Sequence, residues 1–504
     1  MSTLAVLSAA GSAAGSALPP GPDRSVPLGT RLRLDAGVRS YPGPDGGVLL
    51  GGSPLRVLRL NRVAWRELTA LAAGRPAVSA AGASVAGSLL DAGLAQPILG
   101  TRGPTSAEVT VVVPTRDRPA ALARCLQALG PVGTVIVVDD ASRHPSAVAG
   151  VAAAAGARVL RRPANGGPAA ARNTGLAACH TDLVAFVDSD CVPEPDWLAR
   201  LLAHFADPAV AAVAPRVVGL AAPGWLGRYE QARSALDLGP RPGPVVPRTR
   251  IAYVPAAALV TRRAALGAGF SEKLRVGEDV DLVWRLHAEG WRVRYEPAAL
   301  VGHDHRVSIR GWARRKFDYG TSAGPLARRH PGLVPPAVTS LAALLPLVLL
   351  RRGRPLGAAA AVGLAAAGLA RRLPDFSGRR SEAVRLAATG VITTGYGVTQ
   401  AATRAWLPLT LALATRSANA RMALAAGAVV APLVTYAARR PQQDPLRWVV
   451  ASALDDASYC AGLWVGALRA RTLGPLLPAV PELAASGRRL RAGPHPRRHP
   501  RRCP

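Results

Sequence analysis

The order of apolar and polar positions predicts an α/β domain in the middle of the chain. Four short, Val-rich apolar runs have the length and composition of buried strands; they are 109–113, 134–138, 158–160 and 183–187. Between the first two lies a segment, 119–129, whose apolar residues fall on one helical face. Alternation of strands with amphipathic helices is typical of a parallel sheet with crossover helices. We therefore predict a Rossmann-like α/β domain over residues 107–325.

A different pattern precedes this domain, over residues 26–100. β-like stretches are followed by stretches with helical spacing; they are 31–34, 47–50, 64–73 and 83–94. A winged-helix-like module and a generic helical capping domain account for this pattern equally well. Residues 1–25 and the basic stretch 487–504 have no apolar face, so we expect two disordered tails.

Behind the α/β domain the chain is rich in Ala and Leu, which predicts a helical, membrane-associated region over 334–470. Its candidate membrane stretches are 334–350, 355–370, 386–402, 423–438 and 448–468. Several are at or below the length that spans a bilayer. A spanning helix after a cytosolic domain would also place the arginines at 351–354 outside, against the positive-inside tendency. We therefore expect an interfacial or re-entrant hairpin at 334–370, on the cytoplasmic face of the membrane.

The net charge of +31 changes this picture little. The basic residues are almost all Arg, with Lys273 and Lys316 the only lysines, and they accompany abundant Ala, Gly and Pro, as coding bias would produce. Aromatic residues are scarce and do not alternate with the arginines, so the stacking platforms of single-strand binders are absent from the sequence. We therefore expect no nucleic-acid partner.

Acidic residues follow two of the predicted strands, where ligands bind in open α/β sheets. The first strand ends at Pro114 and the second at Asp139 and Asp140. A carboxylate at this edge can accept the imide N–H of a uracil or bind a ribose, although a strand-end Asp pair is as often a helix cap. The Gly-rich turn 165–167 then leads into a helix with Arg172, which can pair with phosphate.

Two further acidic motifs are candidates for metal binding and proton transfer. The strand at 183–187 runs directly into Asp188-Ser189-Asp190, and carboxylates at a strand end can coordinate Mg or Mn. The segment 277–282 supplies Glu278, Asp279 and Asp281 at the start of a helix, and one of them can serve as general base. The alternative interpretation is an acidic helix start stabilised by the macrodipole.

In this order and spacing the motifs resemble the family 2 glycosyltransferases, which have the GT-A fold and bind nucleotide sugars. The resemblance implies an inverting enzyme in which Asp140 contacts the base, Arg172 the nucleotide, and Asp190 the metal with help from Asp188. It implies Asp279 as the catalytic base. Pro114 and Asp139 would border the donor, and Glu278 and Asp281 would shape the acceptor site.

His303 resembles the position of a further donor-site or metal ligand in some relatives, although the residue alone slightly favours an ordinary surface histidine. Arg116 stands where an aromatic residue often follows the Pro-Thr pair. The base-stacking contact, and with it the nucleotide, is therefore open. Residues 314–320 lack the Gln-x-x-Arg-Trp motif of processive synthases, which argues against long-chain synthesis.

The whole chain resembles the glycosyltransferases of the mycofactocin system, with a PqqD-like front unit that includes residues 58–61. This family implies transfer of glucose, with UDP-glucose the favoured donor, to a small peptide-derived redox cofactor precursor. A lipid or cell-envelope glycan acceptor is the second hypothesis, motivated by the apolar rear. A basic membrane-associated scaffold is the non-enzymatic alternative.

Overall fold

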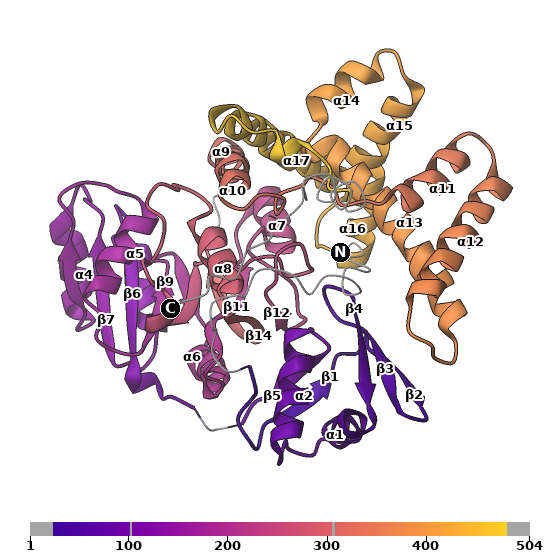
Figure 1. Cartoon of the computed structure of the whole chain (residues 1–504). Coiled ribbons are helices and arrows are strands. Elements are labelled where there is room, and N and C mark those ends of the chain that lie inside the picture. Colours follow the sequence, from indigo (N-terminus) through magenta and orange to yellow (C-terminus); the bar gives the residue numbers. More distant parts are fainter. Residues whose placement is uncertain (1–23, 101–102, 305–307, 481–504) are drawn as a thin grey trace, which may run out of the picture.

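Figure 1 shows a computed structural model, which describes residues 24–100, 103–304 and 308–480. The tail predicted at 487–504, and all but two residues of the tail predicted at 1–25, lie outside the described residues.

A mixed sheet forms the centre of the molecule, in the order β10-β14-β11-β13-β9-β6-β7-β8, with β12 paired to β14. The strands β9, β6, β7 and β8 are parallel, as predicted, and they correspond to the four apolar runs. The sequence pattern did not reveal the antiparallel neighbour of β9, β13. The strands are β6 (Val109–Thr115), β7 (Thr134–Asp139), β8 (Arg158–Arg161), β9 (Leu183–Val187), β10 (Cys191–Pro193), β11 (Val210–Gly219), β12 (Gly243–Pro244), β13 (Ala258–Arg262) and β14 (Arg292–His303).

Helices cover both faces of this sheet because alternate residues of the central strands point to opposite sides. Val111 and Val113 pack with Leu122 on one face, whereas Val112 packs with Phe186 on the other. All five side chains are fully buried. The helices are α3 (Pro119–Ala128), α4 (Pro145–Ala154), α5 (Pro168–Ala177), α6 (Trp197–Leu202), α7 (Gly224–Arg233) and α8 (Glu278–Ala288).

The front of the chain forms a small unit below the sheet, drawn in indigo in Figure 1. Its elements are β1 (Arg31–Leu34), β2 (Arg39–Gly43), β3 (Gly46–Gly51), β4 (Arg56–Asn61), α1 (Arg62–Ala72), α2 (Ala80–Asp91) and β5 (Ala95–Ile98). β1 pairs with β5, and β2, β3 and β4 form a separate antiparallel sheet. Arg292 of β14 ties the unit to the central sheet through Asp91, at 2.8 Å.

The rear of the chain is helical. Its elements are α9 (Ile309–Thr321), α10 (Ala323–Arg329), α11 (Leu341–Arg351), α12 (Pro355–Arg372), α13 (Arg379–Arg404), α14 (Leu407–Ala414), α15 (Ala418–Ala425), α16 (Ala431–Arg439) and α17 (Pro445–Arg469). α12 and α13 also contact the front unit, since Phe376 in the turn between them stacks on Tyr41 with ring centroids 4.4 Å apart. One segment of the described chain, Ala418–Arg439, is long and apolar enough to cross a bilayer.

α17 packs directly on α9 and α10 through glycines. A methyl group on Gly462 would lie 2.0 Å from the carbonyl oxygen of Phe317, and one on Gly320 would lie 2.2 Å from that of Tyr459. α17 contains the predicted membrane stretch 448–468, but Asp455 and Asp456 lie in its middle and are buried in ion pairs. The part of this segment that carries the two acids therefore belongs to the protein core, whereas Val450, Leu454 and Leu468 of the same segment are exposed.

Candidate active site

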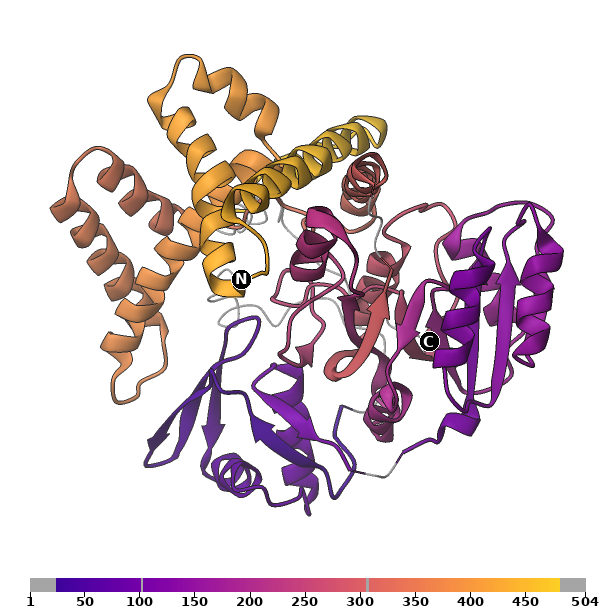
Figure 2. The same cartoon turned by 180° about the vertical axis from the view of Figure 1, so that it is seen from behind.

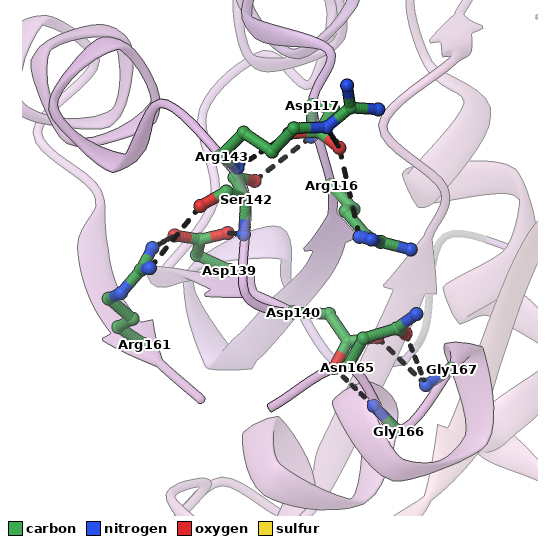
Figure 3. A network of polar contacts seen from close by, with 10 residues as sticks. All are labelled: Arg116, Asp117, Asp139, Asp140, Ser142, Arg143, Arg161, Asn165, Gly166 and Gly167. Atoms are coloured by element: carbon green, nitrogen blue, oxygen red, sulfur yellow. Dashed lines mark hydrogen bonds and ion pairs between the residues drawn. The ribbon is translucent and has the colours of Figure 1, made fainter. Parts of the chain in front are cut away.

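The carboxyl ends of β6 and β7 lie side by side, with Thr115 opposite Asp139, as the parallel arrangement predicts. Asp139 is buried, forms a salt bridge with Arg161, and accepts a hydrogen bond from the backbone N–H of Ser142 at 2.9 Å (Figure 3). Its carboxylate is thus engaged in holding the turn after β7. This geometry favours a structural role over the direct donor contact that we predicted. Pro114 lies at the same edge, opposite Val138.

Asp140 ties the Gly-rich turn to the end of β7. Its carboxylate accepts hydrogen bonds from the backbone N–H groups of Gly166 at 3.0 Å and Gly167 at 2.8 Å (Figure 3). It also accepts one from Arg162 at 2.6 Å. Gly167 has φ of 86°, a conformation that favours glycine, and α5 begins at the next residue. Asp140 therefore positions the start of the helix that carries Arg172.

Arg172 connects the two acidic motifs. Its guanidinium is buried and contacts Asp188 at 2.7 Å and Glu278 at 2.8 Å, with the ring of Phe270 5.3 Å away. Burial lowers the pKa of this guanidinium, but Asp188 and Glu278 outweigh burial and raise the pKa above its usual value. Arg172, which we predicted to contact the nucleotide, thus holds the motifs at 188–190 and 278–279 together.

α8 begins with the two acids that flank this arginine. Burial, followed by the charge of Asp279, raises the pKa of Glu278 to about 7, although Arg172 opposes the shift. Asp279 accepts hydrogen bonds from the N–H groups of Ala256 at 3.3 Å and Val280 at 2.8 Å. Burial is the main cause that raises the pKa of Asp279. A carboxylate whose pKa is raised is a stronger base, which suits proton abstraction.

Asp281 has a different environment from the other two acids of α8. Its side chain is fully buried and pairs with Arg329 at 2.7 Å, His330 at 2.8 Å and Arg285 at 3.2 Å. Burial raises its pKa, but the hydrogen bonds from Arg329 and His330 outweigh burial and lower it. With three cationic or imidazole partners, Asp281 joins α8 to α10. The geometry therefore does not support the predicted place in the acceptor site.

Asp190 immediately precedes β10 and His303 ends β14, and the two strands pair so that His303 lies opposite Cys191. His303 Nε2 lies 3.6 Å from one carboxylate oxygen of Asp190, and Arg118 contacts the other at 2.6 Å. The described part of the chain has no group of three or more His, Cys, Asp or Glu side chains that could hold a metal. Two such ligands fit a divalent cation that takes its remaining ligands from a bound diphosphate and water.

These residues line one side of a hollow whose other side the sequence did not reveal. It is lined by Arg118, Asp190, Glu230, Ser234, Ala235, Leu236, His303, Asp304, Trp312, Arg315, Lys316 and Tyr319. α7 and α9 thus supply its second wall. Burial raises the pKa of Tyr319 in this wall to about 12, although the charge of Arg315 opposes the shift.

A buried ion network fixes that wall. Lys316 contacts Glu230 of α7 at 2.7 Å and Asp455 of α17 at 3.2 Å, and Trp312 donates to Glu230 at 2.7 Å. Arg404 of α13 extends the network to Asp455 and Asp456. This wall was not predicted from the sequence. The one feature of the sequence that could have indicated it is Lys316, which is one of only two lysines among many arginines.

The comparisons with known proteins decide the family. The model of the family "Glycosyl transferase family 2" matches residues 110–266. A pre-mycofactocin glycosyltransferase of Mycobacterium tuberculosis is 42% identical over 470 residues, which are 90% of this chain and 98% of that protein. The chain belongs to the pre-mycofactocin glycosyltransferase family. It is therefore an enzyme, a glycosyltransferase with a GT-A-like mixed α/β fold, and the scaffold alternative is excluded.

The chain also has more distant similarities. The succinoglycan biosynthesis protein ExoU of Rhizobium meliloti is 31% identical over 212 residues, 37% of this chain and 59% of that protein. Among solved structures, the mannosyltransferase PcManGT of Pyrobaculum calidifontis, in complex with GDP-Man and Mn2+, is 19% identical with a TM-score of 0.39. That match covers 71% of this chain and 87% of the mannosyltransferase. At this distance it does not identify the nucleotide or metal of the pre-mycofactocin family member.

Proposed function

We propose that this glycosyltransferase transfers glucose from UDP-glucose, with inversion, to a small peptide-derived redox cofactor precursor of the mycofactocin type. The observation that supports it most is the convergence of separate acidic segments on one sheet edge, where Arg172 contacts both Asp188 and Glu278. The 42% identity to a pre-mycofactocin glycosyltransferase over 90% of the chain supports the acceptor class.

The donor diphosphate lies, in this proposal, in the hollow between Asp190 and α9. Asp190 and His303 would hold a divalent cation, Mn or Mg. Asp188, which pairs with Arg172, fixes the position of the 188–190 motif beside them. The cation, when bound, neutralises charge on the departing diphosphate. Arg118, which pairs with Asp190 at 2.6 Å, lies beside this site and would bind the donor diphosphate through its guanidinium.

Asp279 acts as the base in a single displacement. Its carboxylate takes the proton from the acceptor hydroxyl while that oxygen forms the new bond to the anomeric carbon and the bond to the diphosphate breaks. Attack from the face opposite the leaving group inverts the anomeric centre. The backbone N–H groups of Ala256 and Val280 hold the carboxylate in place for this transfer. Glu278 positions Arg172 from the other side.

The remaining parts of the chain serve binding and location in this proposal. The unit at 26–100 is a PqqD-like, winged-helix-like module that binds the peptide-derived acceptor; its pairing of β1 with β5 and its helices α1 and α2 are compatible with that fold. The helical region within 334–470 associates with the cytoplasmic face of the membrane. A lipid or cell-envelope glycan acceptor is the second candidate, because the rear helices expose many large apolar side chains.

The decisive experiment is a donor and acceptor panel. Purified protein is incubated with UDP- and GDP-sugars, with Mn, Mg or EDTA, and with either the peptide-derived precursor or membrane lipids. We expect metal-dependent transfer from UDP-glucose to the water-soluble precursor, with a β-linked product by NMR. A product that partitions into organic solvent would support the lipid acceptor instead. Equal turnover in EDTA would contradict the metal site, and an α-linked product would contradict inversion.

A further inference from the structure

The large apolar side chains that face solvent are concentrated in the rear helices. Twenty-seven such residues are exposed in the described part of the chain; five precede residue 341 and twenty-two lie between 341 and 477. Soluble surfaces carry single exposed apolar residues, whereas an accumulation of this kind marks an interaction surface. The rear helices therefore present an apolar surface that needs a partner.

The interior of these helices is unlike the interior of a water-soluble core. Between 341 and 440 the buried apolar residues are nine alanines and two leucines, whereas sixteen large apolar residues of the same segment are exposed. Small residues inside and large ones outside are typical of helices that pack against each other in lipid. The distribution favours lipid over a protein partner for this surface.

Two helical hairpins carry most of this surface. The first consists of α11 and α12, with Leu356 and Leu364 exposed by 86% and 76%. The second consists of α14 and the helix that follows, with Leu413 exposed by 61%. Both hairpins project from the side of the molecule opposite β7 and α4, in both views (Figures 1 and 2).

The charge of this region matches an anionic lipid surface. Between residues 334 and 443 the sequence has thirteen arginines and only two acids, Asp375 and Glu382. Glu382 is already paired with Arg385 and Arg39. Exposed arginines lie at the turn of each hairpin: Arg351, Arg352 and Arg354 in the first, Arg416 and Arg421 in the second.

Helix lengths decide how the hairpins meet the bilayer. The eleven residues of α11 and the eight of α14 extend about 16 Å and about 12 Å, roughly half or less of the ~30 Å hydrocarbon core. The segment that begins with α15, Ala418–Arg439, is long enough to cross by itself, but neither hairpin has two helices that can both cross. Insertion tip first would carry the turn arginines into the core, which is costly. Hairpins that lie along the interface keep the arginines at the headgroups and the leucines among the acyl chains.

We infer that the two hairpins α11–α12 and α14–α15 together form a docking surface for an anionic phospholipid bilayer, which they enter from one side without crossing it. This inference rests on the membrane location in the proposed function but not on its donor or acceptor. It assigns the turn arginines to lipid headgroups. It also extends the membrane contact from the hairpin expected at 334–370 to a second hairpin, α14–α15.

Vesicle flotation of the full chain tests the inference. We expect the protein to float with vesicles of phosphatidylcholine and phosphatidylglycerol, to float far less with phosphatidylcholine alone, and to be released by alkaline carbonate. Changing Arg351, Arg352 and Arg354 to Gln should lower partitioning on the order of 100-fold, since each basic residue near an anionic surface contributes about 1 kcal/mol. The double variant Leu356→Ser, Leu364→Ser should also lower it on both kinds of vesicle.

Matched controls lie on the front unit. Arg59, Arg66 and Arg75 are exposed, and their change to Gln removes the same charge. Leu28→Ser with Val78→Ser removes two residues exposed by 64% and 76%. Neither control should change flotation. Equal flotation on neutral vesicles, equal loss in the controls, or retention after carbonate would overturn the inference.

Two further readouts separate the possible failures. The first readout is the oligomeric state without vesicles. If the protein does not float but forms a concentration-dependent dimer, and the double variant Leu356→Ser, Leu364→Ser abolishes that dimer, the surface binds a second copy of the chain and lipid docking is overturned. Glucose transfer to the soluble precursor is measured in the same preparations without vesicles. Flotation without transfer would contradict the proposed function alone, and transfer without flotation would contradict the docking surface alone.

Discussion

Two clusters of charged side chains in this molecule serve different purposes. The sheet-edge cluster consists of Arg172, Asp188, Asp190, Glu278 and Asp279, and Asp190 borders an open hollow. The α17 cluster consists of Glu230, Lys316, Arg404, Asp455 and Asp456, and it joins four helices. Both clusters border this hollow, but Asp190 is partly exposed, whereas Glu230 and Lys316 are almost fully buried in ion pairs. A partly exposed carboxylate is available to a ligand, whereas buried and paired charge holds helices in register.

The largest expected effect separates the two clusters by activity. Asp190→Ala should lower kcat/KM on the order of 1,000-fold, because it removes a group that acts on charge formed in the transition state. Its melting temperature should change little, since Asp190 is partly exposed. Steady-state kinetics and thermal unfolding check both expectations. Asp182→Asn, at the opposite end of β9, is the matched control, and an equal loss there would contradict the assignment.

The next effect concerns stability. Lys316→Met leaves Glu230 and Asp455 without their shared cation and should cost about 3–5 kcal/mol of unfolding free energy, measured by denaturant titration. The other lysine, Lys273, is exposed, so Lys273→Met should cost nothing measurable. If both variants unfold alike, the α17 cluster does not hold the helices together.

Glu278 belongs to the sheet-edge cluster but also affects stability, and this effect should depend on pH. Its pKa is raised to about 7 from 4.5, so between these values the folded protein holds a proton that the unfolded chain has released. This extra proton of Glu278 stabilises the folded state, on the order of 1–3 kcal/mol in total. The stabilisation is therefore full below about pH 4.5 and is lost as pH rises through about 7. Glu278→Gln should flatten this part of the melting-temperature profile between pH 4.5 and 7. The exposed Glu289→Gln should leave the profile unchanged, and a wild-type profile that rises over this range would reverse the sign.

The smallest effect tests whether the front unit is coupled to the rear helices. A double-mutant cycle of Tyr41→Ala and Phe376→Ala should give a coupling energy of about 0.5–1.5 kcal/mol for the stacked rings. Pairing Tyr41→Ala with a distant change such as Leu473→Ala provides the reference cycle, for which we expect no coupling. Additive losses in the first cycle would mean that the front unit and α12–α13 are energetically independent.

The sheet edge was predictable because its motifs are local in sequence. Asp139-Asp140 and Asp188-Ser189-Asp190 follow buried strands, so the positions of these acids could be read from the apolar run before each of them. The partners of these acids were not predictable, since Arg172 meets Glu278 across 106 residues. The same limit explains Asp281, whose partner Arg329 lies 48 residues away. The second wall of the hollow combines residues of α7 and α9 that carry no motif of their own.

The helical region was predicted in outline and not in detail. Its composition indicated helices, and the hairpin expected at 334–370 corresponds to α11 and α12. The same composition made the segment at 448–468 look like a membrane stretch, because an average over many apolar residues hides two acids in the middle. Only the positions of Lys316 and Arg404 in space show that those acids are neutralised inside the protein.

The glycine contacts between α9 and α17 have a practical consequence for anyone who wishes to shorten this chain. Because the two backbones touch without intervening side chains, removal of everything after α10 would uncover Gly320, bare carbonyl groups and the ammonium of Lys316 at once. A free-standing transferase fragment ending near residue 330 would therefore lack the support of one wall of the hollow beside Asp190. The smallest autonomous piece of this enzyme has to keep α17.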